Sequence, residues 1–258
     1  MIKQEGNRKS SDIIFGIRAV NEAIRAGTEI DRIWIKKGLQ GEAFSELFKE
    51  IRDHGISFRF VPVEKLDRVT RKNHQGVIAE VSVITYYRIE DLLPGIFEQG
   101  KMPFILLLDG ITDVRNFGAI ARTAECASVD AIIIPVSEAA QVNADAIKTS
   151  AGALLSLPVC RSYDLVETAA FLRDSGIRII AATEKASALY FNADMTGPVA
   201  IVVGAEDTGI RQSLLDLADE SVSVPLSGKI GSLNVSVAAG ILIFEAVRQR
   251  NEKQYIKL

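Results

Sequence analysis

The second half of the chain alternates short, continuous apolar runs with stretches of helical pattern. The apolar runs are residues 104–109, 131–135, 177–182 and 199–203. The helical stretches are residues 117–128, 143–155, 165–175 and 210–217. Uninterrupted apolar runs are typical of strands covered on both faces, and their alternation with helices favours a parallel sheet. We therefore predict an α/β fold in which helices sandwich a parallel sheet, with ligands bound at the carboxyl ends of the strands.

The loop after the first apolar run leads into a helix that starts with unusual residues. Asn116 and Gly118 begin this helix, and Arg122 lies two turns further on. These residues can have ordinary structural roles, with Asn116 as a helix cap and Arg122 paired with Glu125 at i, i+3. The alternative is that they face a ligand at the end of the strand.

Two more loops of this kind follow. The segment Gly204-Ala-Glu-Asp-Thr-Gly209 comes directly after the last apolar run, and its Glu206 either caps the helix that starts at residue 210 or reaches a ligand. A loop with Gly228 and Gly231 then joins a strand-like stretch at 221–224 to the final helix. Each loop is weakly diagnostic alone.

The final helix is expected to begin near Ser232 and to be buried on most of its circumference. Almost every side chain from residue 233 to 247 is apolar. Four of them recur at helical spacing: Leu233, Val237, Ile241 and Phe244. Ser232 is either the N-cap of this helix or, together with Asn234 and free backbone N–H groups, part of a polar ligand site.

The front of the chain, residues 12–85, reads as a separate small α/β domain. Helices are expected at 13–27, 43–54 and 63–69, and strands at 32–36, 57–61 and 77–84. A linker with some helix follows at 86–102, and the parallel-sheet domain occupies 103–258.

Charge is distributed unevenly between these parts. Up to residue 88 there are 16 Lys/Arg against 12 Asp/Glu, and afterwards 14 against 21. The segment 68–76 is the most basic, and Arg71, Lys72 and His74 either contact a nucleic-acid backbone or simply keep an exposed loop soluble.

The cysteines and histidines exclude a disulfide framework and a metal site. Cys126 and Cys160 both lie in apolar surroundings, which indicates buried thiols in a reducing compartment. The two histidines have no ligand spacing, so no metal is expected. The start of the chain lacks an apolar signal core and the longest apolar run is too short for a bilayer. We therefore expect a cytoplasmic protein without a membrane partner.

Taken in order, the three loops resemble a known set of motifs. Asn116-x-Gly118-x-x-x-Arg122, Gly204-x-Glu206-x-x-Gly209, and Pro225 followed by Ser232-Leu-Asn-Val-Ser-Val-Ala238 resemble the three motifs of the SpoU (TrmH) branch of the SPOUT RNA ribose methyltransferases. The front domain, with Phe15-Gly-Ile-Arg-Ala-Val20 and His74-Gln-Gly-Val77, resembles the RNA-binding domain of that family, which is of the ribosomal-protein L30e type.

This resemblance implies features that residue patterns do not show. The parallel sheet would end in a deep C-terminal trefoil knot, although general rules of chain connection disfavour knots. The knot would bind S-adenosylmethionine and form a homodimer through the C-terminal domain. The apolar surface of residues 233–247 would then be shared between the core and the partner subunit.

The resemblance also implies roles for individual residues. The cofactor would be held at Gly204, Gly209, Val224, Gly231 and Leu233. The catalytic set would be Asn116, Arg122, Glu206, Ser232 and Asn234, and RNA would contact Arg18, Arg71, Lys72 and His74. Arg122 matches the arginine that activates the ribose hydroxyl, and Glu206 would orient Arg122 or the substrate loop. Because arginine is almost never deprotonated, we expect Arg122 to hold a phosphate and stabilise the developing alkoxide, while a phosphate oxygen or water takes the proton.

The function implied is S-adenosylmethionine-dependent 2′-O-methylation of a ribose, that of a guanosine in 23S rRNA. A tRNA ribose methyltransferase of the same family is the alternative. A nucleotide-dependent oxidoreductase is disfavoured because the first strand and turn lack Gly-x-Gly-x-x-Gly. A non-catalytic RNA-binding scaffold would have no need for the five catalytic candidates together.

Overall fold

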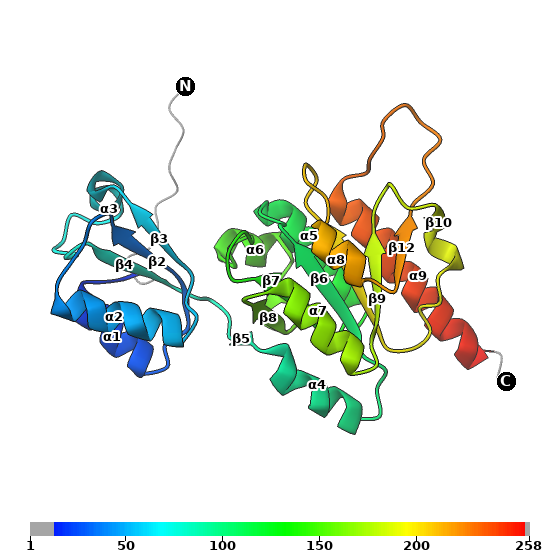
Figure 1. The fold of residues 1–258 in the computed structure, drawn as a ribbon, viewed down its shortest axis with the longest axis horizontal. Coiled ribbons are helices and arrows are strands. Elements are labelled where there is room, and N and C mark those ends of the chain that lie inside the picture. The colour runs from blue at the N-terminus through cyan, green and yellow to red at the C-terminus, as the bar shows by residue number, and fades with distance from the viewer. Residues whose placement is uncertain (1–12, 256–258) are drawn as a thin grey trace. The chain divides into compact units, whose positions relative to one another are not determined.

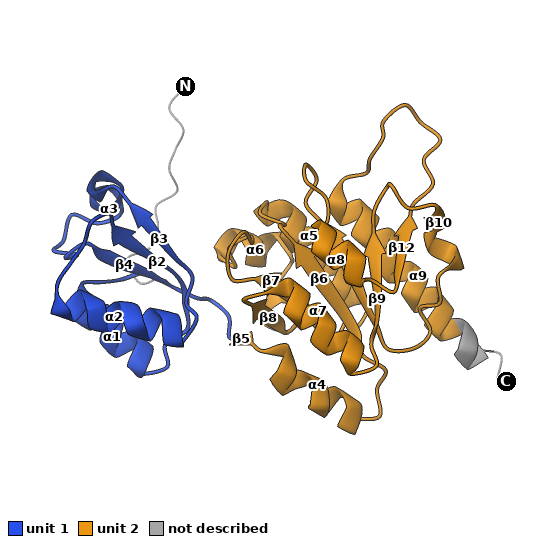
Figure 2. Ribbon diagram, in the orientation of Figure 1, with its two compact units in different colours: residues 1–85 blue, residues 86–258 orange. Residues whose placement is uncertain are grey.

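The computed structural model describes residues 13–255, with side chains to residue 251, and divides into a unit of residues 1–85 and a unit of residues 86–258 (Figures 1 and 2). Residue 12, expected as the first of the front domain, and residues 256–258 lie outside the described part. Each unit has its own sheet.

Unit 1 is built on a mixed four-stranded sheet in the order β1-β4-β2-β3. The strands are β1 (Ile13–Phe15), β2 (Ile30–Lys36), β3 (Phe58–Val61) and β4 (Val77–Val81). β4 runs antiparallel to β1 and β2, and β3 runs parallel to β2. Helices α1 (Ile17–Arg25) and α2 (Glu42–Asp53) pack on one face, and α3 (Val63–Val69) on the other.

The helix expected at 13–27 is wrong at its start. Residues 13–15 form β1, paired with β4, and the helix begins only at Ile17. Gly16 separates the two elements with a φ of 95°, in the region that favours glycine. Three consecutive apolar residues fit the pattern of a buried helix as well as that of a buried strand. The hydrophobic pattern of Ile13-Ile-Phe15 alone could therefore not distinguish the two.

Unit 2 contains eight parallel strands in the order β10-β12-β9-β11-β6-β7-β8-β5. They are β5 (Tyr86–Tyr87), β6 (Phe104–Asp109), β7 (Ala131–Pro135), β8 (Val159–Ser162), β9 (Arg178–Ala182), β10 (Ala188–Leu189), β11 (Val199–Gly204) and β12 (Glu220–Ser223). The predicted parallel sheet is therefore confirmed. Strands β5, β8 and β10 were not predicted because they are too short, or too polar, to stand out.

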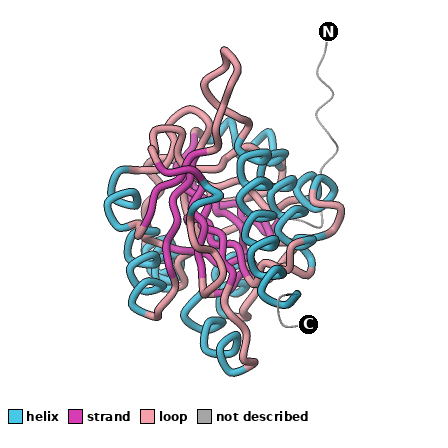
Figure 3. The backbone as a smooth tube through the Cα atoms, turned by 90° about the vertical axis from the view of Figure 1, so that its right-hand side faces the viewer, coloured by secondary structure: helices cyan, strands magenta, loops and turns pink. Residues whose placement is uncertain are grey.

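Helices cover both faces of this sheet (Figures 1 and 3). One face carries α4 (Ile89–Glu98), α7 (Leu165–Asp174) and α8 (Gln212–Leu217). The other carries α5 (Val114–Cys126), α6 (Ala144–Thr149), the short 3-10 helix η1 (Ala153–Leu155) and α9 (Val235–Tyr255); a second 3-10 turn, η2 (Tyr190–Asn192), contacts α9. The threaded knot that the resemblance implies stays a prediction, because strand pairing alone does not define threading.

The segment 86–102, expected as a linker, is part of the second unit. Its β5 extends the sheet by pairing with β8, and its α4 buries Ile89, Leu93 and Ile96 in the core beneath α7. The apolar spacing within α4 explains why the segment packs instead of connecting freely.

The burial expected for two other parts of unit 2 is also corrected. In α9, Val237 and Phe244 are 51% and 50% exposed, so one side of this helix is uncovered in a single chain. Cys126 is exposed, whereas Cys160 is buried and its pKa is raised to about 12 by burial, with a smaller contribution from Glu90 and Asp91.

Among the described residues, none of the helices combines the length and the apolar content that a membrane-spanning helix requires.

The far end of α9 is fastened by one arginine. The Arg250 guanidinium donates hydrogen bonds of 2.7–3.2 Å to four main-chain oxygens, those of Met102, Pro103, Met195 and Gly197. It also lies 4.6 Å from the centre of the Phe104 ring. Five N–H donors in a planar fork make this set of contacts possible, and a lysine ammonium cannot reproduce it.

We predict that Arg250→Lys lowers the free energy of unfolding of unit 2 by about 2 kcal/mol, because it leaves carbonyl oxygens without their donors. Urea unfolding monitored by circular dichroism measures the change. Arg173→Lys is the control, since the exposed Arg173 side chain donates to a single carbonyl among the described residues, that of Leu217. Equal stability of both variants would show that Arg250 does not fasten α9.

Candidate active site

Three loops meet at the carboxyl ends of neighbouring strands in unit 2. Strands β6 and β11 lie side by side with Asp109 opposite Gly204, so the loops that leave them start at the same level. The loop from β12 then leads into α9, which packs against α5. The arrangement brings the three predicted motifs to one edge of the sheet.

Side chains from all three motifs are joined by hydrogen bonds. The Asn234 amide Nδ2 donates to Asn116 Oδ1 at 3.0 Å and also to Glu206 Oε1. The same Glu206 oxygen accepts from the Val235 backbone N–H at 3.2 Å. Because both Nδ2 hydrogens are used, the Asn234 side chain can adopt only one orientation in this network.

The hydrogen bonds show which of the candidate residues cap helices. Asn234, and not Ser232, caps α9, since its Oδ1 accepts from the Ser236 N–H at 3.0 Å. Glu206 does not cap α8; its carboxylate lies at the start of α9, where the helix dipole favours negative charge. The cap of α5 is Asp113, which leaves the Asn116 side chain free to bind Asn234.

Gly204 allows the second loop to fold tightly over the end of β11. A Cβ at this position would lie 2.2 Å from the Gly209 carbonyl carbon and 2.3 Å from the Ile210 nitrogen, so only glycine fits. Gly209 has a φ of 69°, and its N–H donates to the Ala205 oxygen at 2.8 Å. The two glycines therefore present Glu206 on a short, fixed turn.

An ion pair that the sequence did not predict, between buried Asp109 and partly exposed Arg211, fixes the end of the same turn. Asp109, only 4% exposed at the end of β6, accepts from Arg211 Nε at 2.9 Å, from its terminal nitrogen at 2.6 Å and from its backbone N–H at 2.8 Å. This carboxylate raises the pKa of the Arg211 guanidinium. In the sequence, the only sign of this ion pair was an aspartate at the end of a continuously apolar strand.

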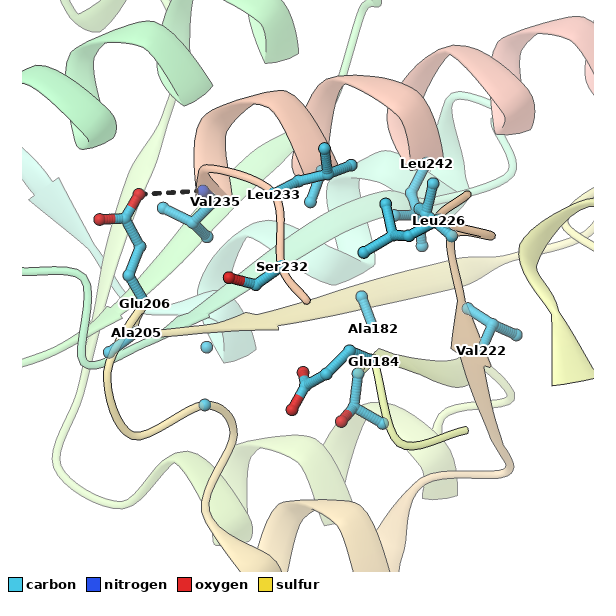
Figure 4. Close-up of a pocket in the computed structure, with 15 residues that line it drawn as sticks. Ala182, Glu184, Ala205, Glu206, Val222, Leu226, Ser232, Leu233, Val235 and Leu242 are labelled. Carbon is cyan, nitrogen blue, oxygen red and sulfur yellow. Dashed lines mark hydrogen bonds between the residues drawn. The ribbon is translucent and has the colours of Figure 1, made fainter. Parts of the chain in front are cut away.

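A pocket opens between the loops and α9 (Figure 4). One part is apolar and includes Val222, Leu226 and Leu242, while Glu206 and Ser232 give another part its polar character (Figure 4). Four of the five residues predicted to bind a cofactor line it, namely Gly204, Gly209, Val224 and Leu233. Gly231 is not among the lining residues. Glu184, which follows β9, also lines the pocket and was not predicted.

Arg122 lies outside the hydrogen-bonded network. Its side chain is exposed on α5 and makes no hydrogen bond or ion pair with any residue in the described part of the chain, so neither the pair with Glu125 nor a contact with Glu206 is formed. Glu206 orients Asn234 and α9 instead. The guanidinium of Arg122 is thus accessible to a ligand.

The basic residues predicted to bind RNA belong to unit 1 and differ in environment. Arg18, Arg71 and Lys72 are exposed, and the Lys72 ammonium lies 5.7 Å from the centre of the Phe15 ring. The Gln75 side chain accepts from the Ile17 N–H at 3.1 Å, which holds the segment 71–76 against the start of α1.

His74, in contrast, is buried and has a partner for each ring nitrogen. It is 8% exposed, its Nδ1 accepts from the Gly76 N–H at 3.0 Å, and its Nε2 lies 2.9 Å from Asp67 Oδ1. The Gly76 contact places the ring proton on Nε2, so both nitrogens are occupied. Both ring nitrogens of His74 thus have partners within unit 1, and a contact of His74 with RNA stays a prediction.

Each of the two units matches a known protein family model. Residues 103–244 match the model of the SpoU rRNA Methylase family, and residues 13–87 match the model described as RNA 2′-O ribose methyltransferase substrate binding. The chain is 37% identical over 243 residues to the 23S rRNA (guanosine-2′-O-)-methyltransferase RlmB of Photorhabdus laumondii, covering 93% of this chain and 99% of that protein.

Solved structures show the same fold. A crystal structure of an RNA 2′-O ribose methyltransferase superposes with a TM-score of 0.52 at 26% identity, covering 93% of this chain and 88% of that one. The SpoU methyltransferase AviRb of Streptomyces viridochromogenes, in complex with the cofactor AdoMet, gives a TM-score of 0.59 at 24% identity, covering 96% and 95%. The chain belongs to the SpoU rRNA Methylase family.

Proposed function

We propose that this protein transfers a methyl group from S-adenosylmethionine to the 2′-hydroxyl of a guanosine ribose in 23S rRNA. The observation that carries the proposal is the convergence of Asn116, Glu206 and Asn234 beside a pocket of mixed polarity. The relative from Photorhabdus laumondii, which is a 23S rRNA (guanosine-2′-O-)-methyltransferase and is matched over 99% of its length, supplies the nucleotide and the RNA. Such a substrate also fits a cytoplasmic protein.

The pocket fits S-adenosylmethionine, which supplies the methyl group. Its apolar part, with Val222, Leu226 and Leu242, suits the adenine. Gly204, Val224 and Leu233 line the same pocket, and their backbone groups would hold the polar edges of the ligand. The part with Glu206 and Ser232 lies next to Asn116 and Asn234, where we place the reacting ribose.

Arg122 supplies the positive charge for the acceptor side of the reaction. A permanently protonated guanidinium can bind an RNA phosphate in a bidentate manner and stabilise the oxygen as it loses its proton. The proton would pass to a phosphate oxygen or to water. The bond between the ribose 2′-oxygen and the methyl carbon would form as the bond between that carbon and sulfur breaks, which leaves S-adenosylhomocysteine, a neutral thioether. The lack of any partner for Arg122 within the described chain supports this role.

A homodimer would complete the site. Val237, Ile241 and Phe244 form an apolar stripe along α9, and two of these side chains are half exposed. Helix α9 packs against α5, which carries Arg122. A second copy on this stripe would cover the apolar surface and bring further residues toward the ribose.

Unit 1 would hold the RNA through its exposed basic residues. Arg18, Arg71 and Lys72 offer charges to the phosphate backbone, and these contacts position the RNA without reading its sequence. The acidic second half of the chain makes this contribution necessary for affinity.

The direct test is methylation of RNA from a strain that lacks the corresponding gene. With labelled S-adenosylmethionine, we expect incorporation into 23S rRNA at one guanosine 2′-oxygen, located by primer extension at low nucleotide concentration. Incorporation into tRNA alone would favour the alternative substrate, and incorporation into neither RNA would contradict the proposed activity.

Replacing Arg122 tests its bidentate role. We expect Arg122→Lys to lower kcat about 100-fold, since the ammonium cannot reproduce the planar pair of donors that stabilises the transition state. Affinity for S-adenosylmethionine, measured by calorimetry, should stay unchanged. Arg173→Lys on α7 serves as the control. Near-normal turnover of Arg122→Lys at neutral pH would rule the role out.

A further inference from the structure

Two carboxylates line the pocket, and they differ in what they already bind. Glu206 is engaged by Asn234 and by the Val235 N–H. The Glu184 side chain is exposed and makes no hydrogen bond or ion pair with any other residue described in the structure. A carboxylate facing a pocket without a partner is available to a cationic ligand.

Glu184 is presented by an ordered turn at the end of β9. The Thr183 N–H donates to the Val222 carbonyl oxygen at 2.9 Å. The Thr183 hydroxyl accepts from the Lys185 backbone N–H at 3.4 Å, and the Thr183 carbonyl accepts from the Ala186 N–H at 3.2 Å. These bonds fix the backbone on both sides of Glu184. Figure 4 shows the carboxylate extended toward the part of the pocket that contains Ser232 and Glu206.

The charges of the cofactor match this position. S-adenosylmethionine carries a sulfonium and an α-ammonium against a single carboxylate, so it is a net cation. If the adenine occupies the apolar part of the pocket, the methionine portion extends toward the polar part. We propose that Glu184 is a cofactor-binding residue that accepts a hydrogen bond from the α-ammonium of this methionine. The inference rests on the proposed function and names one contact within it.

The ammonium fits better than the other polar groups of the cofactor. It donates charge-assisted hydrogen bonds, which are shorter and stronger than neutral ones, whereas the sulfonium has no hydrogen to donate. The sulfonium must also approach the edge formed by Asn116 and Asn234, where the ribose oxygen attacks. The ammonium is then the polar group of the methionine portion that remains for the Glu184 carboxylate, which extends toward the same polar part of the pocket.

This role has a kinetic consequence. The α-ammonium is present before and after methyl transfer, so Glu184 binds the cofactor and the product S-adenosylhomocysteine equally. An interaction that is equal in the ground state and in the transition state lowers KM without raising kcat. Loss of Glu184 should therefore raise the KM for S-adenosylmethionine and leave kcat near the wild-type value.

The experiment compares three ligands by calorimetry on the full-length protein and on Glu184→Gln. We expect S-adenosylmethionine and S-adenosylhomocysteine both to bind roughly tenfold more weakly to the variant, in line with a partly exposed charge-assisted bond. Binding of 5′-methylthioadenosine, which keeps the adenine and ribose but lacks the amino acid, should be unchanged. Its unchanged affinity also shows that the variant is folded.

Glu98→Gln is the matched control, because Glu98 is exposed at the end of α4 and its replacement changes the net charge equally. Unchanged affinity of Glu184→Gln for S-adenosylmethionine would overturn the inference. Equal losses for 5′-methylthioadenosine would overturn it in favour of a ribose contact, and a loss for S-adenosylmethionine alone in favour of the sulfonium. Failure of the wild-type protein to bind S-adenosylmethionine would instead contradict the proposed function.

Discussion

The amide of Asn234 is the interaction on which the site depends. It links the first turn of α5 through Asn116 and the loop after β11 through Glu206, positions 118 and 28 residues away in the sequence. Each hydrogen bond contributes only about 1 kcal/mol. Their value is geometric, because one side chain orients three segments and also caps α9. The pair between Asp109, at the end of β6, and Arg211 holds the same turn.

Helix α9 is held at both ends and partly uncovered between them. Glu206 accepts from its first N–H group, and Arg250 binds four carbonyl oxygens near its other end. Because both ends are fixed, the helix presents Val237 and Phe244 on a rigid surface. A rigid apolar surface is better suited to association than a mobile one, since less conformational entropy is lost on binding. The same anchoring keeps the pocket wall, with Ala238 and Leu242, in place.

The sequence predicted those parts of the molecule that local pattern determines. Runs such as 104–109 and 131–135 became β6 and β7 because a strand buried on both faces must be continuously apolar. Hydrogen-bond partners that are distant in the sequence were not predictable. Asp109 binds Arg211, which lies 102 residues further along the chain, and Glu206 binds Asn234 instead of Arg122. The motifs identified which residues converge, but hydrogen bonding between them depends on how α9 enters. The burial of His74 was not predictable for a related reason, since composition cannot show that a basic loop folds around one of its own side chains.

The most direct test of this account replaces both ends of one hydrogen bond. Asn234→Asp places a second carboxylate beside Glu206. We expect the rate of methyl transfer to fall at least 100-fold, because misplacing a single active-site group commonly costs about that much. Adding Glu206→Gln restores a donor opposite the new acceptor, so the double variant should recover at least tenfold over Asn234→Asp alone. Near-normal activity of Asn234→Asp, or a double variant no better than the single one, would contradict the claim that this bond holds the three loops together.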